Sequence, residues 1–219
     1  MTGFQENYRR TEGNFLLQHH LIGALRILTA GIDPLRVLDY GSGVTPLLGT
    51  TLFKYIRRGQ ETVAYEPFLA DKLMNKVYLN RSISWTNAPP LDQKFDLIVC
   101  SFSLHHAEES PTGVIQDLTS CDPKLIVVSD YDFTDSNQTE FEQEFISETE
   151  QEELQDSFGG DWAECFAFHS RFGVLDYRNA LEGNGFKVGP TRFGIGVAGR
   201  KFVLIGQAGT DNEVLRLII

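Results

Sequence analysis

The apolar and polar positions of the chain follow two alternating periods. Apolar residues recur at helical spacing over residues 14–30, with leucines on one face, which predicts an amphipathic helix. Shorter, nearly continuous apolar runs then follow and predict strands. These runs are 36–40 (RVLDY), 62–66 (TVAYE), 82–85 (SISW), 95–102 (FDLIVCSF) and 124–132 (KLIVVSDYD).

Helical spacing returns between and after these runs, at 47–56, 68–79, 114–118 and 175–181. Strands that alternate with helices require right-handed crossovers and a mostly parallel sheet. Continuous apolar residues in the fourth and fifth runs are typical of strands covered on both faces. Two final strands, at 186–193 and 201–206, should pair antiparallel across a Gly-rich turn. The sequence therefore predicts an α/β fold, a doubly wound and mostly parallel sheet with an antiparallel edge.

Length and composition fit a single domain. The chain has 219 residues, of which 42% are hydrophobic and 22% charged, so it is too apolar for global disorder. We expect residues 1–219 to form one domain, with a helical cap at 1–34 and an acidic and aromatic lid insertion at 133–174. No apolar stretch reaches the roughly 18 residues of a membrane span, and the first residues lack the core of a signal peptide. Three widely spaced cysteines indicate no disulfide framework, so we expect a cytoplasmic setting.

The net charge of -11 is carried by one segment. Residues 135–164 contain eleven acidic residues and no Lys or Arg, which leaves the rest of the chain neutral. A protein that binds a phosphate backbone needs a basic face, so we expect no nucleic acid partner. The acidic run is open to two interpretations: a solvated helix face, or a lid whose field favours a cationic substrate.

A glycine-containing loop follows the first strand, where doubly wound sheets bind their ligands. Gly41 and Gly43 allow a tight turn and the close approach of the backbone to a ligand. A dinucleotide fingerprint requires a third Gly at position 46, which is Pro46, so a nicotinamide dehydrogenase is disfavoured. Asp39 at the strand end suits a ligand that carries a cationic amino group or hydroxyls.

Glu66 ends the second strand and is a second acidic candidate. Its carboxylate has two acceptor oxygens and can accept both hydroxyls of a ribose. Together with the glycine loop, it predicts a nucleoside ligand that spans the ends of the first two strands.

The motifs VLDYGSG, VAYEPF and FDLIVCSFSLHH, taken together, resemble the class I S-adenosylmethionine-dependent methyltransferases. The resemblance covers residues 36–132 and the trailing edge strands. It implies a seven-stranded sheet of order 3-2-1-4-5-7-6 and S-adenosylmethionine as the cofactor. It also implies that Asp39, Gly41 and Gly43 line the methionine end of that cofactor, while Glu66 binds the ribose. The family's usual third loop glycine is Thr45 here.

The resemblance extends to further cofactor contacts. It implies Pro67 and Phe68 beside the adenine, Asn87 and Ala88 at the adenine edge, and Ser101 and Phe102 near the sulfonium. It also implies an N-terminal helix that closes over the cofactor, from which Tyr8 or Arg9 binds the methionine carboxylate.

Residues that follow the fourth and fifth strands would face the methyl group and are the candidate catalytic groups. They are His105, His106 and Asp130. A histidine can deprotonate a hydroxyl, thiol or amine acceptor near neutral pH. The alternative is that these histidines have a structural or cofactor-positioning role. We expect no metal site, because adjacent histidine side chains diverge on most backbones.

An aromatic run at 162–178 is a candidate wall for the acceptor pocket, because pockets combine apolar walls with a few convergent polar groups. The expected substrate-binding residues are Tyr131, His169, Arg171 and Tyr177. The alternative is that this aromatic stripe is ordinary core.

The sequence thus predicts an S-adenosylmethionine-dependent methyltransferase acting on a small molecule, with a cationic or amine-bearing acceptor as one interpretation. Two alternatives remain open at this point. The same cofactor could undergo cyclisation or elimination, giving methylthioadenosine, or the chain could be a non-catalytic, methyltransferase-like partner protein. The loop glycines and Glu66 disfavour the second alternative, and the sequence leaves the oligomeric state open.

Overall fold

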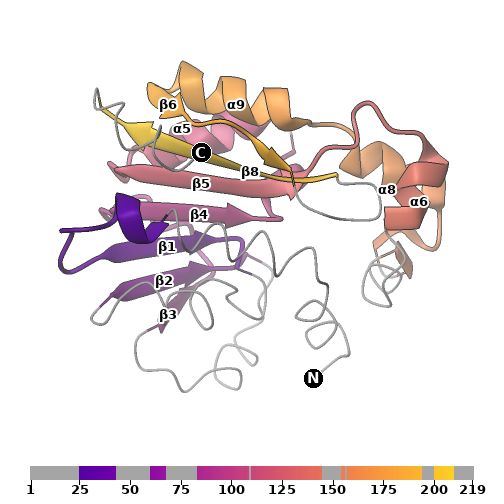
Figure 1. Ribbon diagram of the computed structural model, residues 1–219. Helices are drawn as coiled ribbons and strands as arrows, with labels where there is room; N and C mark the ends of the chain where they lie inside the picture. Colours follow the sequence, from indigo (N-terminus) through magenta and orange to yellow (C-terminus); the bar gives the residue numbers. More distant parts are fainter. Residues whose placement is uncertain are drawn as a thin grey trace.

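The computed structural model (Figure 1) describes residues 25–42, 60–67, 83–108, 110–144, 154–155, 157–193 and 200–209. Tyr8, Arg9, Gly43 and Phe68, four of the expected cofactor-binding residues, lie outside the described residues, as does most of the expected cap at 1–34. The division into a cap and a lid therefore stays a prediction.

One sheet organises the fold. Its strands are β1 (Arg36–Tyr40), β2 (Glu61–Tyr65), β3 (Ile83–Thr86), β4 (Leu97–Ser101), β5 (Leu125–Tyr131), β6 (Phe186–Val188), β7 (Arg192–Phe193) and β8 (Lys201–Ala208). The strand order is β3-β2-β1-β4-β5-β8-β6, and the two-residue β7 pairs with β8 outside this path. Neighbours among β1 to β5 are parallel, whereas β8 is antiparallel to both β5 and β6.

This order confirms the expected arrangement 3-2-1-4-5-7-6, with β8 as the seventh strand. The single strand expected at 186–193 is divided into β6 and β7. Gly189 still donates its N–H to the carbonyl of Ile205 (3.0 Å), but the next residue, Pro190, has no N–H to offer to the ladder.

The described helices are η2 (Leu104–His106), α5 (Pro111–Thr119), α6 (Gln138–Glu144), α8 (Trp162–His169) and α9 (Val174–Gly183). Local chemistry explains where they begin. The Ser110 hydroxyl accepts the N–H of Thr112 at the start of α5, and Pro111 occupies the first helical position. The Asp161 carboxylate caps α8 by accepting two main-chain N–H groups. The helices expected at 114–118 and 175–181 are thereby confirmed, and each is longer than the pattern alone indicates.

Side chains cover both faces of the sheet, as the apolar runs predict. On one face, α5 and α9 pack against β1, β4, β5 and β8 (Figure 1), and Leu38, Ile98 and Ile126 meet Ile115 and Leu181 there. The other face forms a second cluster of buried residues: Leu25, Leu35, Val37, Leu97, Val99, Leu125, Val127 and Val203. All seven residues of β5 are buried.

A third apolar cluster lies beyond the carboxyl end of β5, where α6 and α8 pack together (Figure 1). It contains Phe133, Phe141 and Cys165. Among the helices described, none combines the length and the apolar character needed to cross a membrane. The fold thus brings the carboxyl ends of β1, β2, β4 and β5 to one edge, next to the helices α6 and α8.

Candidate active site

A tight turn after β1 forms the first part of the site. Gly41 and Ser42 both donate their N–H groups to the carbonyl of Tyr65 at the end of β2, at 2.9 and 3.0 Å. Gly41 has a φ of 68°, a left-handed conformation that favours glycine. A Cβ atom at this position would overlap the side chain of Ser103, whose hydroxyl donates to the carbonyl of Tyr40 (2.9 Å). The turn is therefore pressed directly against the segment that follows β4.

Ser103 is a site residue that the sequence patterns did not single out. Its position two residues after β4, in the loop that also carries the candidate histidines, is the only signal that the sequence contains. Its contact with Gly41 depends on how β1 and β4 align in the sheet.

Asp39 is a buried carboxylate at the end of β1, with 1% of its surface exposed. Its Oδ2 atom has no hydrogen-bond partner among the described residues. Burial, and then the negative charge of Glu66, raise the pKa of Asp39 from 3.8 to about 7. A buried acceptor without a donor is costly, so this oxygen fits a ligand that brings a hydrogen-bond donor or a positive charge.

Glu66 lies close enough to Asp39 for the two charges to interact. It follows β2, is partly exposed, and donates its main-chain N–H to the carbonyl of Thr86 (3.0 Å). This bond joins the end of β2 to the turn after β3. The turn is closed by Thr86, whose hydroxyl accepts the N–H of Ala88 (3.1 Å).

The candidate adenine contacts gather at this same place. Pro67, Asn87 and Ala88 are all exposed beside the ends of β2 and β3. The described residues that are candidates for binding the nucleoside thus lie along one edge of the sheet. Their roles stay predictions.

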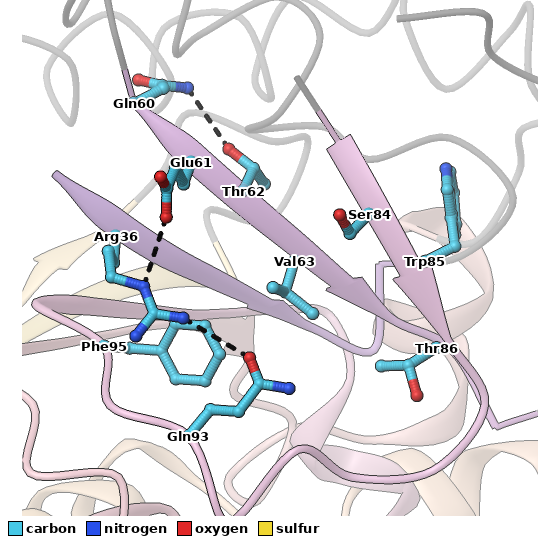
Figure 2. Close-up of a pocket in the computed structure, with 10 residues that line it drawn as sticks. All are labelled: Arg36, Gln60, Glu61, Thr62, Val63, Ser84, Trp85, Thr86, Gln93 and Phe95. Carbon is cyan, nitrogen blue, oxygen red and sulfur yellow. Dashed lines mark hydrogen bonds and ion pairs between the residues drawn. The ribbon is translucent and has the colours of Figure 1, made fainter. Parts of the chain in front are cut away.

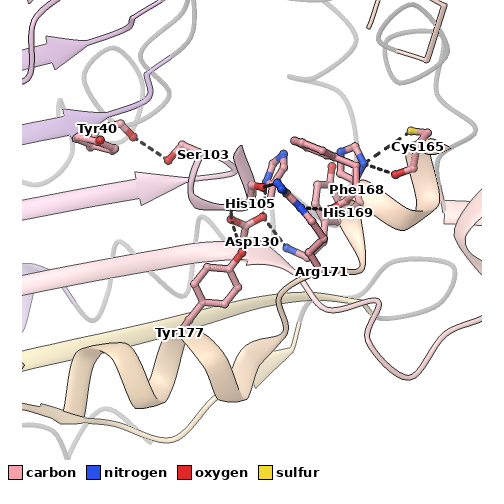
Figure 3. Close-up of polar contacts among 10 residues, drawn as sticks. Tyr40, Ser103, His105, Asp130, Cys165, Phe168, His169, Arg171 and Tyr177 are labelled. Carbon is pink, nitrogen blue, oxygen red and sulfur yellow. Dashed lines mark hydrogen bonds and ion pairs between the residues drawn. The ribbon is translucent and has the colours of Figure 1, made fainter. Parts of the chain in front are cut away.

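The strongest polar cluster joins η2 to β5 (Figure 3). The Nδ1 atom of His105 donates to Oδ1 of Asp130 (2.7 Å), and the main-chain N–H of His105 donates to Oδ2 of the same residue (3.1 Å). His105 is 5% exposed and Asp130 is fully buried. One carboxylate therefore fixes both the backbone and the imidazole ring of His105.

Two further groups hold Asp130 itself. The N–H of Tyr131 donates to Oδ1 (2.9 Å), and the hydroxyl of Tyr177 donates to Oδ2 (3.4 Å). Tyr177 rises from α9 (Figure 3) and is fully buried against Phe202. Burial, together with the negative charge of Asp130, raises the pKa of Tyr177 well above its usual value. Tyr177, expected from the sequence in the acceptor pocket, lies instead in the core and supports Asp130.

The other two described histidines flank His105. The ring centroids of His106 and His169 lie 4.1 and 4.9 Å from that of His105. Burial, and then the charge of His105, lower the pKa of His106 to about 4 and that of His169 to about 3. Nδ1 of His169 donates to the carbonyl of Cys165 within α8 (2.9 Å). Both rings are therefore neutral near pH 7, whereas His105 has a carboxylate partner in Asp130.

Aromatic rings surround this cluster on the side of the third apolar cluster. Tyr131 lies 4.9 Å from Phe102 and 5.9 Å from His105, measured between ring centroids. Phe102 has a φ of 51°, a conformation that is unfavourable for a bulky residue and that turns the chain sharply at the end of β4. The ammonium of Lys201 lies 5.7 Å from the Phe102 ring. Ser101, the last residue of β4, precedes this turn and is partly exposed.

Arg171 approaches His105 from the loop between α8 and α9 (Figure 3). Its Nη2 atom donates to the carbonyl of His105 (2.8 Å), and its Nε atom donates to the carbonyl of Phe168 (3.1 Å). The guanidinium carbon lies 4.2 Å from the centroid of the Phe168 ring. Arg171 therefore contacts the main chain of the candidate base.

A cavity of about 390 Å³ lies elsewhere, over β2 and β3 (Figure 2). Its lining includes Arg36, whose Nε atom lies 3.4 Å from Oε2 of Glu61, together with Gln93 and Phe95. None of the candidate cofactor-binding or catalytic residues lines it. Thr86 lines the cavity and also holds the turn beside Glu66, so the cavity reaches the carboxyl edge only at the end of β3.

Comparisons with known proteins give a family and a fold. A family model described as a methyltransferase domain matches residues 17–189, which is most of the chain. No curated protein sequence matches the chain.

Several solved structures resemble this one. Magnesium protoporphyrin IX methyltransferase from Synechocystis PCC 6803, with bound SAM, has a TM-score of 0.61 at 14% identity, over 95% of this chain and 85% of that chain. The plantazolicin methyltransferase, in complex with SAH, has a TM-score of 0.62 at 12% identity, over 94% and 89%. A SAM-dependent methyltransferase from Aquifex aeolicus has a TM-score of 0.56 at 13% identity, over 90% of each chain. At these identities the likeness shows the fold, in agreement with the strand order.

Proposed function

The chain belongs to the methyltransferase-domain family, and on that premise we propose that it transfers a methyl group from S-adenosylmethionine to a small-molecule acceptor, which His105 deprotonates. The resemblance noted in the sequence is confirmed at the level of the family and the fold. The identity of the acceptor and the roles of individual residues belong to the proposal.

Three observations support S-adenosylmethionine as the cofactor. Asp39 presents a buried oxygen that has no donor among the described residues, which suits the cationic amino group at the methionine end. Glu66 lies close enough to Asp39 for its charge to raise the pKa of that carboxyl, and its two oxygens can accept ribose hydroxyls. Two of the similar structures were solved with SAM or SAH.

When it is bound, S-adenosylmethionine supplies an electrophilic methyl group on a sulfonium. The protein's own contribution is to position the acceptor and remove its proton. Because Nδ1 of His105 donates to Asp130, the proton of the neutral ring is held on that atom, and Nε2 is the basic nitrogen. Nε2 takes the proton of the acceptor, and the Asp130 carboxylate stabilises the imidazolium that results.

The pKa values of the neighbouring histidines leave His105 as the ring that accepts this proton. The pKa values of His106 and His169 are low, at about 4 and 3, so neither ring competes for a proton near neutral pH. The aromatic side chains of Phe102, Tyr131 and Phe168 reduce the access of water to this region. A base of this kind suits an acceptor atom that carries a removable proton, such as a hydroxyl.

The single observation that carries the proposal is the 2.7 Å contact between His105 and Asp130 at the carboxyl edge of the sheet. A buried imidazole that a carboxylate orients, next to the cofactor loop, is the arrangement that a general base requires. The acidic residues of α6 support a finer version of the proposal, in which the acceptor is cationic. One of these residues, Glu140, is paired with Arg200 (3.2 Å).

Calorimetric titration with S-adenosylhomocysteine tests the cofactor site, and we expect binding that the substitution Glu66→Ala weakens. Methyl transfer is tested by incubating the protein with labelled S-adenosylmethionine and a panel of small hydroxyl- and amine-bearing compounds. Formation of S-adenosylhomocysteine only when an acceptor is present supports transfer. Methylthioadenosine formed without any acceptor would instead show cyclisation or elimination. If neither S-adenosylmethionine nor S-adenosylhomocysteine binds, the proposal is overturned.

A further inference from the structure

The main chain of His105 is fixed from two separate elements. Its N–H donates to Asp130 on β5 (3.1 Å), and its carbonyl accepts from Arg171 in the loop between α8 and α9 (2.8 Å). His105 lies in η2, a helix of three residues, and the carbonyls at the end of such a helix lack donors within the helix. Arg171 supplies a donor that the helix itself cannot provide.

Arg171 is held firmly enough to serve as an anchor. Its Nε atom donates to the carbonyl of Phe168 (3.1 Å), and its guanidinium carbon lies over the rings of Phe168 and Phe172, at 4.2 and 5.2 Å from their centroids. A planar guanidinium with several donors can make these contacts at the same time, which a lysine cannot.

The loop that carries Arg171 is also closely packed. A Cβ atom at Gly173 would overlap the side chains of Asp132 and Thr134, which follow β5. The N–H of Gly173 donates to the carboxylate of Asp176 in the first turn of α9 (2.8 Å). The position of Arg171 is therefore set by the same end of β5 that provides Asp130.

We propose that Arg171 is a positioning residue, which holds the imidazole of His105 in line with Asp130 by fixing the main-chain carbonyl of His105. This inference rests on the proposed function of His105 as the base. It gives Arg171 a different role from the substrate contact that the sequence suggests. Without this bond the carbonyl of His105 loses the donor that Arg171 provides, the main chain of His105 can shift, and the ring can turn away from the carboxylate. A displacement of about 1 Å at a catalytic group can cost about 100-fold in rate.

The test follows the His105 ring directly by NMR of the ligand-free protein labelled with ¹⁵N-histidine. The substitution Arg171→Met keeps an apolar stem over Phe168 but removes every donor. Arg171→Lys keeps one donor group. Arg178→Met is the matched control, because Arg178 also donates to a main-chain carbonyl, that of Gly189 (2.9 Å), but makes its contacts on α9 and the β6–β7 segment.

In the wild-type protein we expect a single neutral tautomer of His105, protonated at Nδ1, with a proton signal shifted downfield by Asp130. In Arg171→Met we expect that signal to disappear and the two ring nitrogens to approach an averaged shift. Arg171→Lys should restore the signal in part, and Arg178→Met should leave it unchanged. A merely structural role for Arg171 would lower the melting temperature without changing the tautomer.

Unchanged His105 signals in Arg171→Met would overturn the inference, as would an equal change in Arg178→Met. If Arg171→Met does not fold, Arg171→Gln provides the second test, because its amide keeps the side chain polar but reaches less far than a guanidinium. Wild-type His105 signals in that variant would overturn the inference, and a weakened downfield signal would support it. The proposed function fails separately, through the absence of nucleoside binding in calorimetry, and the NMR result does not depend on that outcome.

Discussion

The Oδ1 atom of Asp130 lies 2.7 Å from Nδ1 of His105, and Oδ2 of the same carboxylate lies 3.1 Å from the main-chain nitrogen of His105. One carboxylate therefore aligns both the ring and the main-chain N–H of His105, the proposed base. The same contact fixes which ring nitrogen carries the proton, because the carboxylate can only accept. The reactive nitrogen is thereby defined before any acceptor enters.

Replacing Asp130 by Asn should inactivate the protein without removing the cofactor site. The amide can donate to Nδ1 and so stabilise the wrong tautomer, and it cannot stabilise the imidazolium. We expect a loss of about 100- to 10,000-fold in kcat for an acceptor that needs deprotonation, within the range of general-base catalysis. The measurement is steady-state methyl transfer, with the Kd for S-adenosylhomocysteine as the internal control. A kcat within twofold of the wild type would exclude His105 as the base.

The buried carboxyl of Asp39 should make the stability of the ligand-free protein depend on pH. Its pKa is raised from 3.8 to about 7 in the folded state, so the folded protein binds the proton more tightly than the unfolded chain. The resulting contribution to stability is present below about pH 4 and is lost as the pH rises through about 7. Asp39→Asn removes this dependence. We therefore expect thermal melts of wild type and variant to diverge between about pH 4 and 8, with the variant more stable at the upper end. Parallel curves across this range would contradict the assignment.

The same group should link cofactor affinity to pH in the opposite direction. A cationic amino group next to Asp39 favours the ionised carboxylate, so S-adenosylmethionine should bind more tightly at about pH 8 than at about pH 6. In Asp39→Asn we expect affinity at the higher pH to fall about tenfold or more, since a charge-assisted hydrogen bond contributes about 1.5–3 kcal/mol. Calorimetric titrations at both pH values, on both proteins, provide the check. An Asn variant that keeps the full pH dependence would place its origin elsewhere.

Gly41→Ala should be much more disruptive than the same change at another left-handed glycine. Gly41 and Gly31 both have positive φ, at 68° and 87°, but only at Gly41 would a Cβ meet the side chain of Ser103; at Gly31 it meets no atom within 4 Å. We expect Gly31→Ala to cost about 1 kcal/mol from the backbone alone, and Gly41→Ala clearly more.

The double variant Gly41→Ala, Ser103→Gly separates two effects: the overlap of the new Cβ with the Ser103 side chain, and the backbone strain of alanine at a positive φ. Removal of the Ser103 side chain should restore part of the lost stability, which urea unfolding of all four proteins of the cycle would measure. Strict additivity of the two substitutions would mean that the loop can move away from β4, contrary to the packing described above.

Tyr177→Phe tests the deepest contact of the cluster. The substitution keeps the ring against Phe202 and removes only the donor to Oδ2 of Asp130. We expect a loss of about 1 kcal/mol of stability, typical of a single hydrogen bond, and a reduction in kcat smaller than that of Asp130→Asn. Thermal melts and methyl-transfer rates on the same preparation separate the two effects. An unchanged melting temperature would show that the bond contributes little in the folded protein.

Hydrophobic periodicity predicts most of this fold, because each strand buries its residues on a fixed pattern. The first strand is observed at the expected residues, and Asp39, Glu66 and His105 each lie at or just after the carboxyl end of a parallel strand, as the alternation implies. The bond between Arg171 and His105 could not be predicted in this way. The two residues are 66 positions apart, and their contact depends on how the loop after α8 packs against the end of β5. Aromatic residues near helical spacing likewise do not reveal whether they face a ligand or the core, and Tyr177 proved to be core.

Asp130 belongs to the folded core and to the proposed reaction at once. It is fully buried in β5, and each of its oxygens accepts two donors, from three different residues. Such a residue tolerates few replacements, because a change at this position disturbs the packing of β5 and the alignment of His105 together.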